Sequence, residues 1–301
     1  MIKRLDDLAD AVKGAETKKL SVAGGHDHET LLAVSRAVKD NIVSAVLVGD
    51  KCRMEKVAEE YDIDLSLFEI INIEDDAEAA AEAVKLVSTS KADILMKGAV
   101  KTAQYLKAIL NREWGLLPPG SLLCHIAVLD IPSYHKLLIV SDAAIIPLPD
   151  LDQKIQLIKQ TTSAARQLGI ETPKVALISA VETVNSKIPS SVDAAIMTLM
   201  NRRNQIKGSV LDGPLALDVA LSEKKCEIKG LQSPVGGDAD VLIFPNIESG
   251  NVFYKSATVI AGGKTAAVVA GTTAPVVLTS RADSDDSKYY SIVFAAQLSN
   301  K

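Results

Sequence analysis

The feature that most constrains this chain is a repeated alternation of short apolar runs and helical segments. Runs such as Leu20–Ala23, Ser44–Val48, Phe68–Asn72 and Asp93–Met96 are each followed by a segment with helical spacing. For example, Lys51–Tyr61 follows the second of these runs and Asp75–Ser88 follows the third. Short apolar runs that end at turn-forming residues indicate strands buried on both faces. Because strand–helix–strand crossovers produce parallel strands, the alternation predicts an α/β fold with mostly parallel sheets flanked by helices.

One region, Leu122–Leu129 followed closely by Leu137–Val140, breaks the alternation. A parallel pair needs a crossover of about a dozen residues or more, so this pair is predicted to be antiparallel. The chain has 301 residues, and single cores rarely grow past about 250–300 residues. We therefore expect two lobes divided near this break, one formed by residues 1–141 with 284–301 and the other by residues 142–283.

Composition excludes several classes of protein. Aromatic residues make up 4% of the chain and the net charge is −5, which argues against a nucleic-acid binder with a basic surface. The three cysteines Cys52, Cys124 and Cys226 are far apart and form no CxxC pair, so we predict a reducing, cytoplasmic environment. The amino terminus does not resemble a signal peptide, and no apolar run reaches the roughly 18–20 residues that span a bilayer, so no membrane association is expected.

Polar residues at the ends of predicted strands are candidate ligand contacts, because ligands bind outside the carboxyl ends of parallel strands. Ser280 and Arg281 follow the apolar run Pro275–Leu278. Arginine holds phosphate through a planar fork of donors, and the serine hydroxyl is a further donor. On this pattern alone, an alternative is equally well supported, in which Ser280 caps the last helix and Arg281 pairs with the acidic residues that follow.

A second candidate is the strand-to-helix turn from Lys97 and Gly98 to Thr102. A glycine there lets the backbone approach a ligand, and a helix N-terminus favours an anion. Thr102 is a candidate N-cap. The alternative is a simple capped turn with an exposed lysine.

Several separated motifs resemble the phosphate acetyl/butyryl-transferase family. They are FPNIESGN at 244–251 with Lys255, KGAVKT at 97–102, LDGPLALD at 211–218 and LTSRAD at 278–283. The last two are more similar to the butyryl branch. The resemblance implies two α/β lobes with an active cleft between them, in a fold similar to isocitrate and isopropylmalate dehydrogenases. It also implies a homodimer or a larger assembly of dimers.

The resemblance also implies roles for individual residues. Ser280 would stabilise the transition state, Arg281 would bind phosphate, and the Lys97–Gly98 turn with Thr102 would contact phosphate. The family has an aspartate shortly after the Ser-Arg pair, but that position aligns with Ser287 here. The acid/base group is therefore not identified by the resemblance.

Further candidates shape the cleft or contact coenzyme A. Asp212 and Gly213 follow a predicted strand and are expected to shape the cleft. Another set surrounds the start of a helix and is expected to bind CoA or acyl phosphate: Asn246, Gly250, Asn251 and Lys255. Gly250 has an equally supported alternative, which is close helix packing.

We therefore predict a CoA-dependent phosphate acyltransferase. Phosphate would attack butyryl-CoA directly in a ternary complex, giving butyryl phosphate and CoA, with acetyl-CoA as the alternative substrate. No bound cofactor or metal is expected. More distant alternatives are a metal-dependent decarboxylating dehydrogenase of similar fold and a non-catalytic CoA-binding protein.

Two other groups of residues are weaker candidates. The run His26-Asp27-His28-Glu29 suggests a metal site, but histidines two apart point in different directions on a helix, and no third ligand is evident to join them. A loop and N-cap role, or a substrate contact, is the better interpretation. Among possible cysteine nucleophiles, Cys124 is predicted to be buried, and Cys52 and Cys226 are predicted to be exposed.

Overall fold

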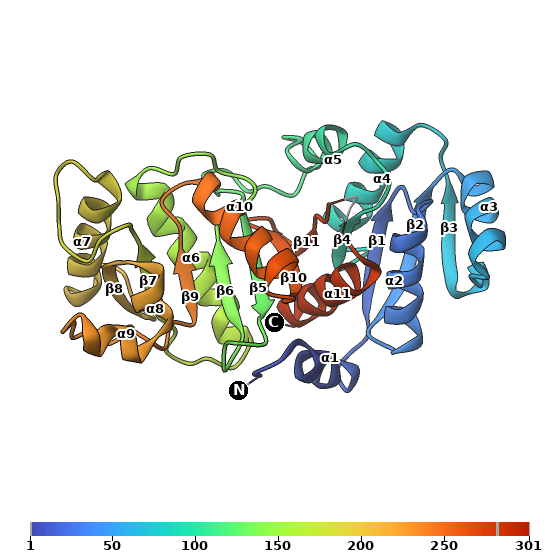
Figure 1. Cartoon of the computed structure of the whole chain (residues 1–301). Coiled ribbons are helices and arrows are strands. Elements are labelled where there is room, and N and C mark those ends of the chain that lie inside the picture. The colour runs from blue at the N-terminus through green and yellow to red at the C-terminus, as the bar shows by residue number, and fades with distance from the viewer. Residues whose placement is uncertain (1, 281–282, 301) are drawn as a thin grey trace. The chain divides into compact units, whose positions relative to one another are not determined.

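The computed structural model describes residues 2–280 and 283–300, and the chain divides into two compact units. We call Leu5–Leu123 with Thr265–Lys301 the terminal unit, and Met1–Arg4 with Cys124–Lys264 the central unit. Each unit is an α/β structure in which mostly parallel strands are flanked by helices, as the sequence predicted (Figure 1).

The terminal unit contains strands in the order β3-β2-β1-β4-β11-β10. All neighbouring pairs are parallel except β10 and β11, which are antiparallel. The strands are β1 (Lys18–Ala23), β2 (Val43–Gly49), β3 (Phe68–Asn72), β4 (Ile94–Lys97), β10 (Lys264–Ala270) and β11 (Val276–Val277).

Six helices surround these strands within the part of the terminal unit that the structure describes. They are α1 (Leu5–Lys13), α2 (His28–Lys39), α3 (Lys51–Tyr61), α4 (Asp76–Ser88), α5 (Thr102–Ile109) and α11 (Asp285–Ser299), with a short 3₁₀ turn at Leu65–Leu67. Helix α11 packs beside α2 and α1, while α4 packs beside α5 (Figure 1). Every residue of α11 from Lys288 to Ala296 is buried, so this helix forms part of the core.

The central unit contains strands in the order β5-β6-β9-β7-β8. The β5–β6 pair is antiparallel, as predicted, and the other neighbours are parallel. The strands are β5 (Cys124–Asp130), β6 (Leu138–Ser141), β7 (Lys174–Ile178), β8 (Val210–Leu215) and β9 (Val241–Ile243). The helices are α6 (Leu151–Gln167), α7 (Pro189–Arg202), α8 (Leu217–Leu221), α9 (Glu223–Ile228) and α10 (Ile247–Lys255), which continues into a π-helical turn at Ser256–Ile260.

The structure places both unit boundaries away from the sequence-based positions of 141/142 and 283/284. The first boundary lies before β5, because β6 pairs in parallel with β9 of the central unit. The second lies next to the start of β10, because β11 pairs with β4 of the terminal unit. The break in the alternation therefore belongs wholly to the central unit.

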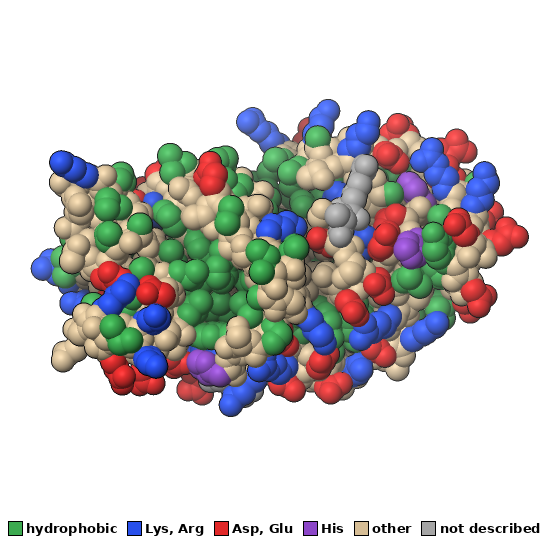
Figure 2. All heavy atoms as spheres, in the orientation of Figure 1, with side chains coloured by type: hydrophobic (Ala, Val, Ile, Leu, Met, Phe, Trp, Pro, Cys, Tyr) green, Lys and Arg blue, Asp and Glu red, His purple; other side chains and the backbone are tan. Residues whose placement is uncertain are grey.

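Figure 2 shows acidic and basic side chains interspersed with hydrophobic and other uncharged areas on the face in view. Along the described residues, no helix is both long and apolar enough to cross a bilayer.

Candidate functional site

A cavity of about 370 Å³ lies at the carboxyl ends of β1 and β4 in the terminal unit. Its lining includes Lys97, Gly98 and Ser280, which the sequence nominated, together with His26 and Lys288. The size falls within the usual range for small-molecule sites, about 300–1,000 Å³. The fold therefore brings three of the predicted phosphate-site residues to one hollow.

The turn after β4 is held against the end of β1 by backbone hydrogen bonds. The Gly98 N–H donates to the Ala23 carbonyl at 2.8 Å, and the Ala99 N–H donates to the Gly24 carbonyl at 2.7 Å. A Cβ on Gly98 would overlap the Gly24 carbonyl oxygen. Glycine is thus required for the packing of one chain segment on another, and these two amides are already engaged by carbonyl oxygens.

Lys97 differs from the exposed lysine of the alternative interpretation. It is only 3% exposed, and its Nζ donates to the Gly98 carbonyl at 3.0 Å. A buried ammonium is costly unless polar or anionic groups compensate for its lost hydration. The Lys97 side chain lines the cavity, so a bound anion would supply such compensation.

Thr102 is not the N-cap that the sequence suggested. Helix α5 begins at Thr102, and Lys101 occupies the N-cap without a side-chain capping bond. Thr102 is exposed and does not line the cavity. Its contact with phosphate stays a prediction.

Two hydrogen bonds join Ser280 to Asp283. The Ser280 N–H donates to the Asp283 carboxylate at 2.8 Å, and the Asp283 N–H donates to the Ser280 carbonyl at 3.2 Å. Ser284 is the N-cap of α11 and accepts from the Ser287 N–H, so the alternative in which Ser280 caps this helix is wrong. Arg281 lies outside the described residues.

Besides the residues that the sequence nominated, further charged and polar side chains line the cavity: His26, Asp27, Glu29, Arg53, Asp76, Thr279 and Lys288. The sequence analysis had allowed only an N-cap or a substrate contact near His26, and Asp27 does cap α2 by accepting from the Thr30 N–H at 3.0 Å. Lys288 escaped notice, although a single lysine directly before the buried run of α11 was an available signal.

His26 lies partly buried at the cavity. Burial lowers the pKa of its imidazole, and Arg53 acts in the same direction, while Asp76, Asp27 and Asp50 oppose the shift. Among the described residues, the His26 Nδ1 and the Asp27 Oδ2 are buried atoms with no hydrogen-bond partner.

The residues nominated around the start of α10 all belong to the central unit and make structural contacts there. Asn246 caps α10 by accepting from the Ser249 N–H at 2.9 Å. The Asn251 amide donates to the Ala143 carbonyl at 2.9 Å. A Cβ on Gly250 would overlap the carbonyl oxygen of Asp142, which favours the packing interpretation of this glycine.

The other nominated residues of the central unit also have local neighbours. The Asp212 carboxylate lies 3.8 Å from the Arg202 guanidinium, and a Cβ on Gly213 would come within 2.6 Å of the Leu177 Cβ. The Lys255 ammonium lies 5.2 Å from the centre of the Tyr254 ring. Their proposed contacts with CoA stay predictions.

The cysteines are poor candidates for a nucleophile. Burial raises the pKa of the Cys124 thiol far above its ordinary value, and the nearby Asp142 adds to the shift. Cys226 was predicted to be exposed, but it is buried beneath the segment that follows α9, and its thiol donates to the Val219 carbonyl at 3.2 Å. Cys52 is exposed and does not line the cavity.

Known proteins with similar sequences match nearly the whole length of this chain. The family model described as Phosphate acetyl/butaryl transferase matches residues 4–85 and 77–296. A phosphate butyryltransferase from Clostridium acetobutylicum is 46% identical over 98% of both chains. A phosphate acetyltransferase from Thermotoga maritima is 40% identical over 97% of this chain and 98% of its own.

Solved structures agree with this assignment. The structure of a branched-chain phosphotransacylase from Enterococcus faecalis is 35% identical, covers 94% of this chain and 99% of its own, and superposes with a TM-score of 0.84. A 4-hydroxythreonine-4-phosphate dehydrogenase from Burkholderia phymatum shares the fold alone. It is 12% identical and superposes with a TM-score of 0.53, covering 94% of this chain and 99% of its own. This likeness agrees with the dehydrogenase-like fold that the sequence predicted. The chain belongs to the phosphate acetyl/butyryl transferase family.

Proposed function

We propose that this chain transfers an acyl group from a CoA thioester to inorganic phosphate, with butyryl-CoA as the preferred substrate. The observation that carries the proposal is the cavity that gathers Ser280, Lys97 and Gly98 in a chain of this family. The butyryl preference is supported by the relative with 46% identity, which is a phosphate butyryltransferase. Acetyl-CoA is the alternative, because the acetyl-specific relative is 40% identical.

The proposed mechanism is direct attack in a ternary complex. Arg281 holds the phosphate, and a phosphate oxygen forms a bond to the thioester carbonyl carbon. The Ser280 hydroxyl stabilises the negative charge that develops on the carbonyl oxygen. The carbon–sulfur bond then breaks, and the proton carried by the phosphate passes to the leaving thiolate. The products are the acyl phosphate and CoA.

An acyl-enzyme route has less support. The thiol of Cys124 is buried, donates to the Gln160 side chain at 2.8 Å, and has a strongly raised pKa. Because the thiolate is the reactive form, this cysteine is inert near pH 7. For the dehydrogenase alternative, no cluster of three or more potential metal ligands in the described residues offers support.

Thiol release tests the proposal. Butyryl-CoA and acetyl-CoA are each incubated with the protein, with and without phosphate, and free CoA is measured with a thiol reagent. We expect release that depends on phosphate and is faster with butyryl-CoA. Release without phosphate would indicate a thioesterase, and no release with either substrate would overturn the proposal.

Arg281→Ala tests the placement of the phosphate site. We expect a higher KM for phosphate and slower turnover, with an unchanged far-ultraviolet circular dichroism spectrum. A folded variant with unchanged phosphate dependence would show that the site lies elsewhere.

We also propose a homo-oligomer built from dimers in the cytoplasm. Three apolar side chains on α10 and the turn after it support an interface, because Val252, Val259 and Ile260 are 66%, 79% and 84% exposed. All three cysteines are free thiols, as expected in a reducing compartment. Light scattering at several protein concentrations tests the assembly, and a monomer at all of them would overturn it.

A further inference from the structure

Lys288 is a buried cation in the wall of the cavity. Its side chain extends from α11 and is 4% exposed, and its ammonium lies 3.1 Å from the Oδ1 of Asp27. Moving an ammonium out of water costs several kcal/mol unless nearby groups compensate for the lost hydration. The contacts that remain open to Lys288 therefore indicate what the cavity binds.

That compensation is incomplete within the described residues. An ammonium has three N–H donors, and here the Asp27 carboxylate is its one hydrogen-bond acceptor. The same Oδ1 also accepts from the Thr30 N–H at 3.0 Å. The other oxygen of Asp27, Oδ2, is buried and has no partner among these residues.

The cavity thus offers unfilled donors next to an unfilled acceptor. The turn at Gly98 and Ala99 does not supply donors through its two amides, because both donate to backbone carbonyls. These two amides are therefore not available to an anion, and side chains in the wall such as Lys288 are the candidate donors. Hydrogenphosphate matches the arrangement, since it carries anionic oxygens that accept hydrogen bonds and one hydroxyl that donates one.

We propose that Lys288 and Asp27 form the subsite for inorganic phosphate. Lys288 donates to an anionic phosphate oxygen, and the Asp27 Oδ2 accepts from the phosphate hydroxyl. This inference rests on the proposed function and adds to it two phosphate ligands that lie outside the Ser280–Arg281 and Lys97–Thr102 motifs. CoA also carries phosphate groups, and the two sources are separated below by measuring each substrate on its own.

Lys288→Gln is the first test, with steady-state rates measured against phosphate and against butyryl-CoA. A charge-assisted hydrogen bond that is lost from a bound ligand corresponds to a rise of roughly 10- to 100-fold in the KM for phosphate. We expect the KM for butyryl-CoA to stay within about twofold, and kcat to be retained, because uniform binding interactions act on KM.

Asp27→Asn tests the acceptor separately. Asparagine is as good an N-cap as aspartate, so α2 keeps its cap through the Oδ1. An amide nitrogen in the place of Oδ2 donates and cannot accept the phosphate hydroxyl. We expect the KM for phosphate to rise in this variant too, and an unchanged value would overturn the role of Asp27.

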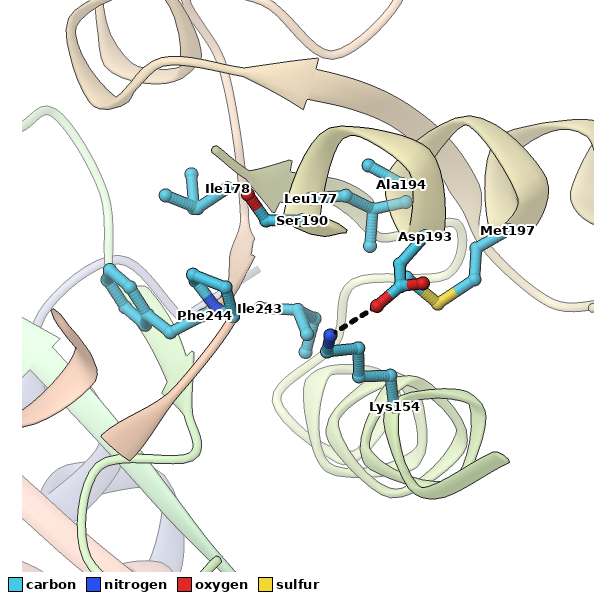
Figure 3. Close-up of a pocket in the computed structure, with 10 residues that line it drawn as sticks. Lys154, Leu177, Ile178, Ser190, Asp193, Ala194, Met197, Ile243 and Phe244 are labelled. Atoms are coloured by element: carbon cyan, nitrogen blue, oxygen red, sulfur yellow. Dashed lines mark hydrogen bonds and ion pairs between the residues drawn. The ribbon is translucent and has the colours of Figure 1, made fainter. Parts of the chain in front are cut away.

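Lys154→Gln is the matched control, because it breaks a buried lysine–aspartate pair in the central unit. The Lys154 ammonium lies 2.6 Å from Asp193, and the two side chains are 7% and 27% exposed (Figure 3). The corresponding values for Lys288 and Asp27 are 4% and 27%. Both lysine variants should lose stability to a similar extent, but only Lys288→Gln should raise the KM for phosphate.

A binding measurement makes the test independent of catalysis. Inorganic phosphate should raise the thermal unfolding midpoint of the unmodified protein relative to chloride at equal ionic strength, and Lys288→Gln should lose this effect while Lys154→Gln keeps it. If Lys288→Gln leaves the KM for phosphate unchanged, or raises only the KM for butyryl-CoA, the inference is overturned while the proposed function stands. If the unmodified protein shows no phosphate-dependent thiol release, the proposed function fails, and the stabilisation by phosphate still decides whether Lys288 binds it.

Discussion

Replacing Gly98 by alanine should damage both stability and activity, because the added methyl group has no room. Its Cβ would overlap the Gly24 carbonyl oxygen, and it would lie 2.9 Å from the Gly24 carbonyl carbon and 3.1 Å from the Ala23 oxygen. These neighbours are backbone atoms, so they cannot rotate away as a side chain could. They are also the acceptors of the hydrogen bonds from Gly98 and Ala99.

The magnitude follows from these contacts. Overpacking costs typically about 1–3 kcal/mol, and weakening two backbone hydrogen bonds adds about 0.5–1.5 kcal/mol for each. We expect Gly98→Ala to lower the free energy of unfolding by about 3 kcal/mol, and to lower phosphate-dependent thiol release at least about tenfold through displacement of Lys97.

Urea unfolding and the thiol-release assay measure the two effects. Gly14→Ala is the control, because a Cβ at Gly14 meets no atom within 4 Å and should change stability by less than about 1 kcal/mol. A Gly98→Ala protein with the stability and activity of the control would refute the argument that close backbone packing builds this turn.

Three further predictions concern local interactions. Asp150→Ala removes the capping box of α6, in which Asp150 and Gln153 exchange hydrogen bonds. The free energy of unfolding measured in urea should fall by about 1 kcal/mol, and an unchanged value would contradict this prediction. Burial alone would raise the pKa of Asp238, but hydrogen bonds from Lys136 and its neighbours outweigh it and hold the pKa well below its ordinary value. The stability that this carboxylate contributes is therefore present above about pH 4 and lost on acidification. In Asp238→Asn, the free energy of unfolding should fall less on acidification than in the unmodified protein. An identical pH profile in the two proteins would count against this prediction. Burial lowers the pKa of His26 in the folded protein, so on acidification the unfolded chain binds a proton at this histidine before the folded chain does. The free energy of unfolding should therefore fall as the pH drops below about 6.5. His26→Gln should lose less stability than the unmodified protein between about pH 7.5 and pH 5.5, and an equal loss would refute the assignment.

Local structure could be predicted well wherever one segment carried its own signals. The helix Lys51–Tyr61 and the strand Phe68–Asn72 have the bounds that the sequence indicated. The antiparallel arrangement of β5 and β6 followed from the short connection alone. In each case the evidence lay in neighbouring residues, through apolar spacing, turn residues or connection length.

Features that depend on distant segments could not be predicted in this way. Cys226 lies in a polar stretch, and its burial depends on packing against residues such as Gly236. Lys288 is buried because α11 from Lys288 to Ala296 packs against other elements of the terminal unit, among them α1, α2, β4 and β11. The Gly98 N–H donates to a carbonyl at the end of β1 because of the register of β4 beside β1. A glycine at a position typical of ligand contact can thus use its N–H for packing between strands instead.

The terminal unit is assembled from the two ends of the chain, and this sets an order on its completion during synthesis. The segment Leu5–Leu123 leaves the ribosome first, and the whole central segment follows before Thr265–Lys301 is made. Synthesis adds roughly 5–20 residues per second, so many seconds separate the synthesis of β4 from that of β11, with which it pairs in the folded sheet. An unpaired strand edge is prone to wrong pairing, so the nascent chain is most vulnerable to aggregation during this interval. Since Ser280 and Lys288 follow the whole central segment in the chain, the cavity cannot bind its ligand until that segment and the start of α11 have been translated.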